Sequence, residues 1–419
     1  MQNRIMARAI RRSSGRLKRV LLAWEYGAGR THYGNLLSVA AHLRASGIEC
    51  LAALCDTSSD REFIALGIHT IQNFVWPSQR RGHPTWKATE SRGFTDHLAR
   101  VGLNSGTAVT AAIAHYDGVF SLFQPDLVVC DQAYGAILAA RDLIPVIAMA
   151  ASSQLPPVIA GGFPLYPDYT EPVWPVERLL ESINEGLTLA GRFPLSNIGQ
   201  FLELDGVMPF GPGAFDLYAA YRTTPVLSPN VPGILDVLPD TVGDEVFIYL
   251  HGLIQNYSEV VDALTTLSLP TRAYIPNLTR PTAERLPANV VIEDYPVKLR
   301  EILSRSRCVL HHGGLQLTAA CLAAGLPQVI LSKELDNRIS GAFVESNGLG
   351  ATSWIGDVKA DWLDEALTAA YQQLGESCRS RAEEFQKWFS DDASAVVARA
   401  ACKLMGVAMR QRATTREPA

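Results

Sequence analysis

The sequence lacks the usual marks of membrane, secreted and metal-binding proteins. No apolar stretch reaches the roughly 20 residues that a membrane-spanning helix needs, and the N-terminus has no apolar core typical of a signal peptide. The seven cysteines include no CxxC pair, and no DxD or HxxxH spacing is present to hold a divalent cation. We therefore expect a cytoplasmic protein without a zinc site, a redox dithiol or a bound metal ion.

Acidic residues are missing from the N-terminus, the one place where charge is distributed unevenly. The first nineteen residues hold seven basic side chains: Arg4, Arg8, Arg11, Arg12, Arg16, Lys18 and Arg19. We expect residues 1–18 to form a disordered tail, either a solvated leader or an arm that makes peripheral contact with anionic lipid. Because the rest of the chain is acidic overall, no nucleic-acid partner is expected.

Length and composition favour two domains with large cores. The chain has 419 residues, of which 47% are hydrophobic and 19% charged. In the first half, short apolar runs alternate with helical patterns, and we expect strands at Val20–Trp24, Glu49–Leu54, Leu127–Cys130 and Val146–Ala150. This alternation predicts a doubly wound parallel sheet of the α/β class.

The second half repeats this pattern after a connector at 225–243 that is rich in proline and glycine. Its expected strands are Val246–Leu250, Thr271–Ile275, Val290–Ile292 and Gln328–Leu331. We therefore predict an N-terminal domain over 19–224, a C-terminal domain over 244–390, and a helix and tail over 391–419. Two Rossmann-like domains of this kind would face each other across a cleft, where ligands bind at the carboxyl ends of the strands.

The motif HHGGLQLTAACLAAGL is the most informative part of the chain. An apolar strand pattern stops at His311 and His312, two glycines follow, and a helix of small residues begins at Leu315. Gly313 and Gly314 permit a tight turn, so that the N–H groups at the start of the helix face a ligand. The motif predicts a phosphate site to which either histidine could add an N–H donor. A simple strand-to-helix turn with two incidental histidines is the alternative.

A long irregular segment, Ser152–Pro175, is rich in proline, glycine and aromatic residues. Loops of this length inside a compact domain are usually functional. Phe163, Tyr166 and Trp174 could form the wall of a binding site for an apolar molecule, or they could simply cover the core.

These motifs together resemble inverting glycosyltransferases of the GT-B fold, which transfer sugars from nucleotide diphosphates to small molecules, as plant secondary-metabolite and bacterial macrolide or glycolipid enzymes do. The stretch EYGAGRTHYGNLL resembles a glycine-rich loop whose acceptor-side histidine falls on His32, and PDLVVCD resembles the strand that ends in its acidic partner, Asp131. HHGG and AAGLPQVILSKELDNR resemble the donor-binding segment. There the histidine for the diphosphate falls on His311, and the pair for sugar hydroxyls falls on Asp336 and Asn337. The resemblance covers nearly the whole chain.

The resemblance implies a metal-independent transfer from a UDP- or dTDP-sugar, with no cofactor besides this co-substrate. His32 would activate an acceptor hydroxyl, because an imidazole titrates near neutral pH and a buried carboxylate such as Asp131 can orient it. Both residue types also occur as satisfied structural histidines and helix caps. The implied donor site comprises His311, Gly313, Gly314, Gln316, Thr318, Asp336, Asn337, His251 and Tyr295.

The donor segment departs from the family pattern at several positions. The triplet LQL at 315–317 replaces Ala-Gly-Thr, and Thr318 follows one position later, so Gln316 either crowds the phosphate or replaces the lost hydroxyl with an amide N–H. Tyr295 stands where members carry a tryptophan that stacks on the nucleobase. His251, in a YLHG motif, is either a second phosphate donor or a bystander.

These departures leave two other kinds of protein open. One is a catalytically silent protein of the same fold that binds a sugar nucleotide or a partner, and the other is a hydrolysing or epimerising sugar-nucleotide enzyme. The presence of both His32 and Asp131 favours an active transferase, since a pure binding protein needs no base. The aromatic loop suggests a small apolar acceptor, such as a polyketide or a lipid, bound by Phe163, Tyr166 and Trp174.

Overall fold

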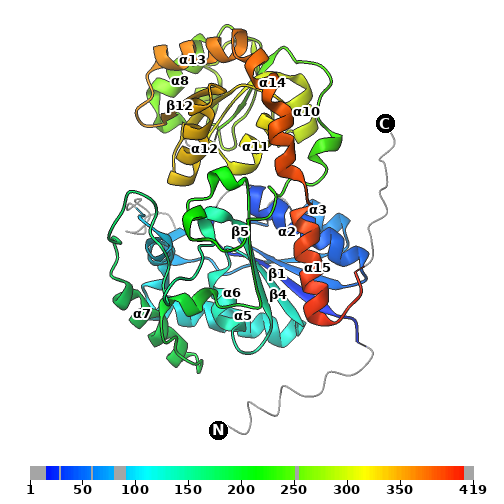
Figure 1. The fold of residues 1–419 in the computed structure, drawn as a ribbon, viewed down its shortest axis with the longest axis vertical. Coiled ribbons are helices and arrows are strands. Elements are labelled where there is room, and N and C mark those ends of the chain that lie inside the picture. The colour runs from blue at the N-terminus through cyan, green and yellow to red at the C-terminus, as the bar shows by residue number, and fades with distance from the viewer. Residues whose placement is uncertain (1–15, 28–29, 58–59, 80–90, 251–253, 410–419) are drawn as a thin grey trace. The chain divides into compact units, whose positions relative to one another are not determined.

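The computed structural model describes residues 16–27, 30–57, 60–79, 91–250 and 254–409 (Figure 1). The chain forms two compact units. Unit 1 consists of Met1–Phe210, Leu217–Leu227 and Ala393–Ala419, and unit 2 consists of Gly211–Asp216 and Ser228–Asp392. The chain therefore passes between the units more than once.

Unit 1 is built on a six-stranded parallel sheet with the strand order β3-β2-β1-β4-β5-β6. Its strands are β1 (Arg19–Trp24), β2 (Glu49–Leu54), β3 (His69–Gln72), β4 (Leu127–Asp131), β5 (Val146–Ala151) and β6 (Gly206–Phe210). Its helices are α2 (Arg30–Ala45), α3 (Arg61–Ala65), α4 (Phe94–Leu98), α5 (Gly106–Phe123), α6 (Tyr134–Ala140), α7 (Val176–Leu189) and α15 (Ala393–Met405).

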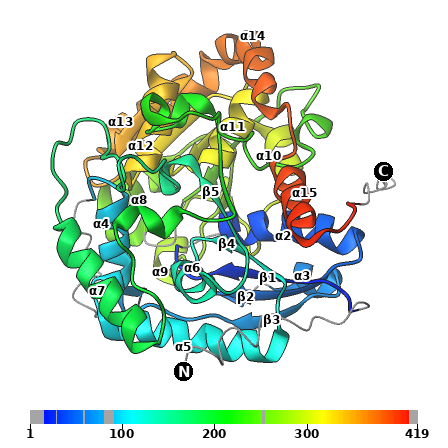
Figure 2. The same ribbon diagram turned by 60° about the horizontal axis from the view of Figure 1, so that its bottom comes forward.

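Both faces of this sheet are buried, which explains its apolar strands. Along β1, Leu21 and Ala23 belong to the core beneath α5 and α6, whereas Leu22 and Trp24 belong to the core beneath α2 and α15. Figure 2 shows α5 on one side of the sheet and α2 and α15 on the other. The alternation of side chains along β1 thus assigns each residue to one of two helical layers.

Unit 2 repeats the topology with the strand order β12-β11-β10-β7-β8-β9. Its strands are β7 (Glu245–Tyr249), β8 (Thr271–Tyr274), β9 (Val290–Ile292), β10 (Ser306–His311), β11 (Gln328–Ser332) and β12 (Gly350–Trp354). Its helices are α8 (Ser258–Thr266), α9 (Arg280–Ala283), α10 (Leu299–Arg305), α11 (Leu315–Ala323), α12 (Leu335–Ser346), α13 (Ala360–Gln372) and α14 (Gly375–Gln386). The prediction of two doubly wound parallel α/β sheets is confirmed.

The C-terminal helix α15 returns to unit 1 after the chain has completed unit 2. Val397, Ala401 and Met405 are buried in the same core as residues of α2. Among the described residues, no helix combines the length and the apolar character needed to cross a membrane.

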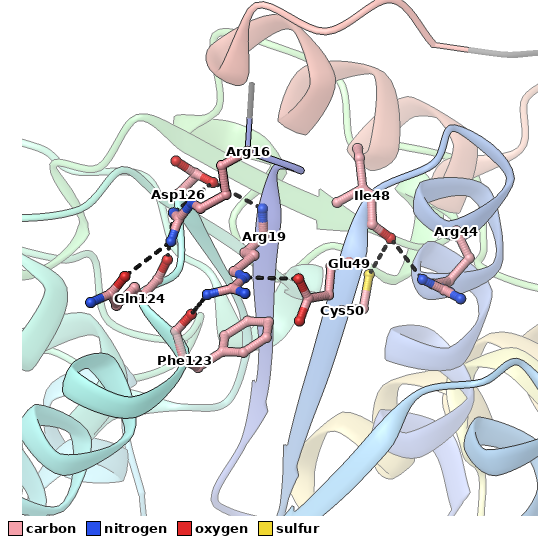
Figure 3. A network of polar contacts seen from close by, with 9 residues as sticks. All are labelled: Arg16, Arg19, Arg44, Ile48, Glu49, Cys50, Phe123, Gln124 and Asp126. Atoms are coloured by element: carbon pink, nitrogen blue, oxygen red, sulfur yellow. Dashed lines mark hydrogen bonds and ion pairs between the residues drawn. The ribbon is translucent and has the colours of Figure 1, made fainter. Parts of the chain in front are cut away.

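Three basic residues at the start of the described chain contact acidic residues of unit 1 at the amino-terminal edge of its sheet, and Figure 3 shows Arg16 and Arg19 among them. The buried carboxylate of Asp126 accepts hydrogen bonds from the backbone N–H of Arg19 at 2.9 Å and from the Arg16 guanidinium at 3.4 Å, and lies 3.9 Å from the Lys18 ammonium. The Arg19 side chain pairs with Glu49 at 2.8 Å. Each of these three basic residues therefore lies next to an acidic side chain of the unit, while residues 1–15 of the predicted tail lie outside the described residues.

Candidate active site

The centre of the candidate site in unit 1 lies where two neighbouring strands end. Trp24, the last residue of β1, pairs in register with Asp131, the last residue of β4. The strand order reverses between β1 and β4, and ligands bind at such switch points in doubly wound sheets. His32 sits in the first turn of α2, which follows β1, and its Nδ1 lies 2.8 Å from Asp131 Oδ1. Two residues that are 99 positions apart in sequence thus form one hydrogen-bonded pair.

The surroundings of Asp131 determine which nitrogen of His32 carries a proton. Asp131 is fully buried, and its second oxygen, Oδ2, accepts a hydrogen bond from Asn35 Nδ2 at 2.7 Å. Because a carboxylate can only accept, His32 must donate from Nδ1. A neutral imidazole then has its lone pair on Nε2, which is the state required of a general base.

Two backbone features shape the space around His32 Nε2. Gly27 has φ +96°, and a Cβ at this position would lie 2.7 Å from His32 Nε2, so only glycine fits here. Gln132 has φ 48°, a left-handed conformation that is costly for a residue with a side chain. Its amide nitrogen lies 3.5 Å from His32 Nε2. This nitrogen is therefore bordered by a glycine turn and a polar amide.

A partly buried histidine and a buried tyrosine beside this pair were not anticipated from the sequence. His97 Nε2 lies 2.8 Å from the Tyr134 hydroxyl, and Arg100 donates to His97 Nδ1 at 3.3 Å. Burial, followed by the positive charge of Arg100 and the proximity of His32, lowers the pKa of His97 to about 3. His97 is therefore neutral, and because Nδ1 accepts from Arg100, Nε2 must donate to Tyr134. No local sequence motif predicts this contact, because α4 and α6 are brought together only by the tertiary structure.

One buried carboxylate on α4 forms hydrogen bonds to the aromatic loop Ser152–Pro175. Asp96 accepts hydrogen bonds from the backbone N–H groups of Arg92 at 2.9 Å, Val173 at 3.1 Å and Trp174 at 2.7 Å. The Trp174 side chain is itself 37% exposed. The loop is thus held through its backbone, which leaves the indole of Trp174 partly at the surface.

The three aromatic residues predicted to bind an acceptor make different side-chain contacts. Phe163 contacts Phe94 edge to face at 5.1 Å and lines a pocket of about 420 Å³. The pocket is otherwise bordered mainly by residues 159–164, the start of α7 and residues 196–198. Tyr166 packs against Tyr218 at 5.9 Å, and neither it nor Trp174 belongs to the pocket lining.

The phosphate motif in unit 2 has the predicted backbone form. β10 ends at His311, Gly313 adopts φ +86°, and α11 begins at Leu315 with Gly314 as its N-cap residue. A Cβ on Gly313 would lie 2.8 Å from Ile330 and 2.9 Å from the carbonyl oxygen of Asn337, so the turn packs directly against the start of α12. The motif again lies at a switch point, between β7 and β10. The first N–H groups of α11 can therefore bind an anion.

Several side chains predicted to bind the donor are engaged within unit 2 instead. His311 is fully buried, its Nε2 lies 2.9 Å from Gln328 Oε1, and its Nδ1 accepts from the Gly313 N–H at 3.1 Å. Burial lowers the pKa of His311 to about 4, so the ring is neutral. Thr318 donates its hydroxyl to Gly314 O at 3.0 Å, and Gln316 donates to Asn230 O at 2.9 Å. This geometry argues against direct phosphate contacts by His311 and Thr318, which shape the turn.

The second histidine of the motif is better placed for a ligand. His312 is only partly buried, and its Nε2 would lie 3.4 Å from a Cβ on Gly314, close to the helix start. Its ring meets Tyr249, at the end of β7, edge to face at 5.1 Å, and Tyr249 stacks on Tyr274 at 5.9 Å. An imidazole and two phenol rings therefore lie at the carboxyl edge of this sheet.

The remaining predicted donor residues are only partly placed. Asn337 lies beside the Gly313 turn, as noted above. Tyr295 is 77% exposed. His251 and the side chain of Asp336 lie outside the described residues. Within the described part of the chain, no three His, Cys, Asp or Glu side chains gather in a way that could hold a metal ion.

Comparison with known proteins identifies relatives that match parts of the chain in sequence. Residues 258–389 match the family described as erythromycin biosynthesis protein CIII-like, C-terminal domain. The elloramycin glycosyltransferase of Streptomyces olivaceus is 32% identical over 99 residues, which are 23% of this chain and 26% of that protein. The aligned segment thus spans about a quarter of the length of this curated relative.

Solved structures match nearly the whole chain. The glycosyltransferase VinC in complex with dTDP has a TM-score of 0.62 and 18% identity, and covers 93% of this chain and 100% of its own. The calicheamicin glycosyltransferase CalG4 has the same TM-score and identity, with 93% and 99% coverage. A UDP-glucosyltransferase from Polygonum tinctorium has a TM-score of 0.56 and 13% identity, with 94% and 100% coverage. The predicted GT-B fold is confirmed, and the relatives in sequence and in fold are glycosyltransferases.

Proposed function

We propose that this chain, which has the GT-B fold, is a glycosyltransferase that moves a sugar from a UDP- or dTDP-sugar to a hydroxyl group of a small apolar acceptor. The observation that carries the proposal is the 2.8 Å contact between His32 Nδ1 and Asp131 Oδ1 at the carboxyl edge of the unit 1 sheet. A second doubly wound unit with a glycine turn before α11 supports the binding of a nucleotide diphosphate.

In the proposed reaction, His32 Nε2 removes the proton of the acceptor hydroxyl while its oxygen attacks the anomeric carbon. The bond between that carbon and the diphosphate oxygen breaks, and its electron pair leaves with the nucleoside diphosphate. Attack on the face opposite the leaving group inverts the anomeric configuration. The Asp131 carboxylate stabilises the imidazolium that forms and holds the ring by its Nδ1–H.

The leaving diphosphate is stabilised by backbone rather than by a metal ion in this proposal. The N–H groups at the start of α11 and the positive end of its dipole lie at the Gly313–Gly314 turn. We assign the imidazole contact to His312, because the His311 ring is fully buried and engaged with Gln328 and Gly313. Asn337 lies beside the same turn and is a candidate for a sugar hydroxyl. Nucleotide release that persists in excess EDTA would support metal independence.

The primary test is nucleotide release from UDP- and dTDP-sugars in the presence of candidate acceptors, compared between the native protein and His32→Ala. We expect turnover to be lost while the affinity for the nucleotide, measured by calorimetry, is kept. His69→Ala is the matched control, because His69 is an exposed histidine on β3 of the same unit. Equal turnover in His32→Ala and the native protein would remove His32 from the mechanism.

A catalytically silent sugar-nucleotide-binding protein is the second candidate. This candidate is favoured because two side chains of the altered donor segment are engaged within the protein: Gln316 donates a hydrogen bond to Asn230 O, and Thr318 donates one to Gly314 O. The two candidates separate in one experiment. A silent protein would bind UDP or dTDP without releasing nucleotide from any donor and acceptor pair, and its behaviour would not change in His32→Ala.

A further inference from the structure

A carboxylate that plays no part in the proposed chemistry is buried next to the base. Glu25 follows β1 directly and has no exposed surface. Its Oε1 accepts a hydrogen bond from the Ala136 N–H at 2.8 Å, and its Oε2 accepts from the Gly135 N–H at 2.9 Å and from Trp76 Nε1 at 2.7 Å.

These partners suit an ionised carboxylate. Burial is the larger effect and raises the pKa of Glu25 above its ordinary value, whereas the hydrogen bonds from Gly135, Ala136 and Trp76 act in the opposite direction. Two backbone N–H groups and an indole N–H can only donate, so each of them requires an acceptor oxygen of Glu25. A fully buried carboxyl group that is costly to ionise and accepts hydrogen bonds from three donors requires an explanation other than stability alone.

The position of Glu25 relative to Asp131 supplies that explanation. Trp24 pairs in register with Asp131 and belongs to the core beneath α2. Since side chains alternate along a strand, Glu25 points to the opposite face, where Trp76 and Tyr116 lie. The end of the sheet is thus held from both faces, by the His32–Asp131 pair on one side and by Glu25 on the other.

The backbone between these two anchors is strained. Asp131 and α6 are joined by Gln132 and Ala133, and Gln132 adopts φ 48°. Such a conformation costs roughly 1–3 kcal/mol and persists only where its surroundings over-determine it. Glu25 accepts hydrogen bonds from the N–H groups just after this turn. Asp131, the partner of His32 Nδ1, lies just before the turn, and Gln132, whose side-chain amide lies next to His32 Nε2, is part of it.

We propose that Glu25 is a positioning residue for the base: by holding the start of α6 it fixes the strained turn at Gln132 and, through it, the geometry of Asp131 and Gln132 around His32. The inference rests on the proposed glycosyl transfer for its kinetic consequence. Its structural consequence, a change at the His32 ring, does not depend on any reaction.

The test compares Glu25→Gln with a matched control, Asp126→Asn. Asp126 is a second buried carboxylate of unit 1 that accepts a backbone N–H, from Arg19, but it lies at the amino-terminal edge of the sheet. We expect Glu25→Gln to lower kcat by about 100-fold, the usual cost of misplacing a catalytic group by about 1 Å, with little change in the donor KM. Asp126→Asn should leave kcat near the native value at a temperature where both variants are folded.

A second readout follows the His32 ring itself by ¹⁵N NMR titration. In Glu25→Gln the titration of the His32 nitrogens should shift from the native curve, whereas Asp126→Asn should superimpose on it. If Glu25→Gln fails to fold, Trp76→Phe removes one of the three donors to Glu25 while keeping an aromatic ring at this position. This variant should shift both kcat and the His32 titration in the same direction as Glu25→Gln, by a smaller amount. Native kcat and a native His32 titration in the folded variants would overturn the inference. An inactive native protein would refute the proposed transfer, while the titration would still decide the role of Glu25.

Discussion

Replacing Asp131 with asparagine should inactivate the protein by moving a single proton. The two carboxylate oxygens of Asp131 face two donors, His32 Nδ1 at 2.8 Å and Asn35 Nδ2 at 2.7 Å. An amide has only one oxygen. Because the Asn35 amide donates on one side, the new oxygen should turn toward it, and the new NH₂ group should face His32 Nδ1. That nitrogen must then accept, so the ring proton moves to Nε2 and the base is lost.

The expected size of this effect comes from the same tautomer reversal in a Ser-His-Asp triad, where the exchange lowers kcat by about 10⁴-fold, or about 5 kcal/mol of activation free energy. Asp131→Asn should therefore reduce kcat for nucleotide release by about three to four orders of magnitude while leaving the affinity for UDP or dTDP unchanged. ¹⁵N chemical shifts of the His32 ring would report the proton on Nε2 instead of Nδ1.

A double exchange tests the reasoning more sharply. In Asn35→Asp combined with Asp131→Asn, the carboxylate at position 35 can only accept, so the amide at position 131 should turn its NH₂ group toward it. Its oxygen would then face His32 Nδ1, which restores the productive tautomer with the same total charge. We expect kcat to recover by about tenfold or more over the single variant. A single variant that keeps most of the native kcat, or a double variant that remains protonated at Nε2, would refute the tautomer argument.

Three further predictions concern stability and the aromatic loop. The low pKa of His311, about 4, means that folding favours the neutral ring, so its contribution to stability should fall by about 3 kcal/mol as pH drops from about 6.5 toward 4. Because the low pKa of His97, about 3, adds a slope of the same sign, urea unfolding at several pH values should show a smaller slope in His311→Asn than in the native protein. Gly313→Ala should lower the free energy of unfolding by more than the roughly 1 kcal/mol expected for Gly348→Ala, since both glycines have positive φ but only the former would clash with neighbouring atoms; equal losses in thermal unfolding would contradict this. Asp96→Ala leaves three backbone N–H groups without their acceptor and should raise the acceptor KM roughly tenfold with little effect on the donor KM, whereas a change in donor KM alone would argue against an acceptor role for the loop.

Much of the fold could be predicted because its determinants are local and repetitive. The strands Glu49–Leu54 and Val290–Ile292 have the predicted bounds, and α11 begins at Leu315 as expected. Apolar runs of this length, separated by helical patterns, leave few arrangements other than a parallel sheet covered on both faces. The helix α5 (Gly106–Phe123) was not predicted: it has no charged residue except Asp117, so the polar face that marks an amphipathic helix is weak.

The candidate site was only partly predictable, because residue types do not reveal their partners. The paired histidines illustrate this point. Both stand at the end of β10, yet His311 is buried against Gln328 while His312 remains partly exposed beside Tyr249. Side chains alternate along a strand, so adjacent histidines must point to different surroundings, and the sequence does not say which of them faces a ligand.

The sequence by itself determined the two α/β units, the ends of the strands that lead to His32 and Asp131, and the glycine turn before α11, because each depends on short-range periodicity and on backbone freedom. Only the tertiary structure decided which ring nitrogen of His32 holds a proton, and that Glu25 lies against the start of α6. These outcomes depend on contacts between residues about a hundred positions apart, and such contacts form only when parallel strands bring distant loops to one edge of a sheet.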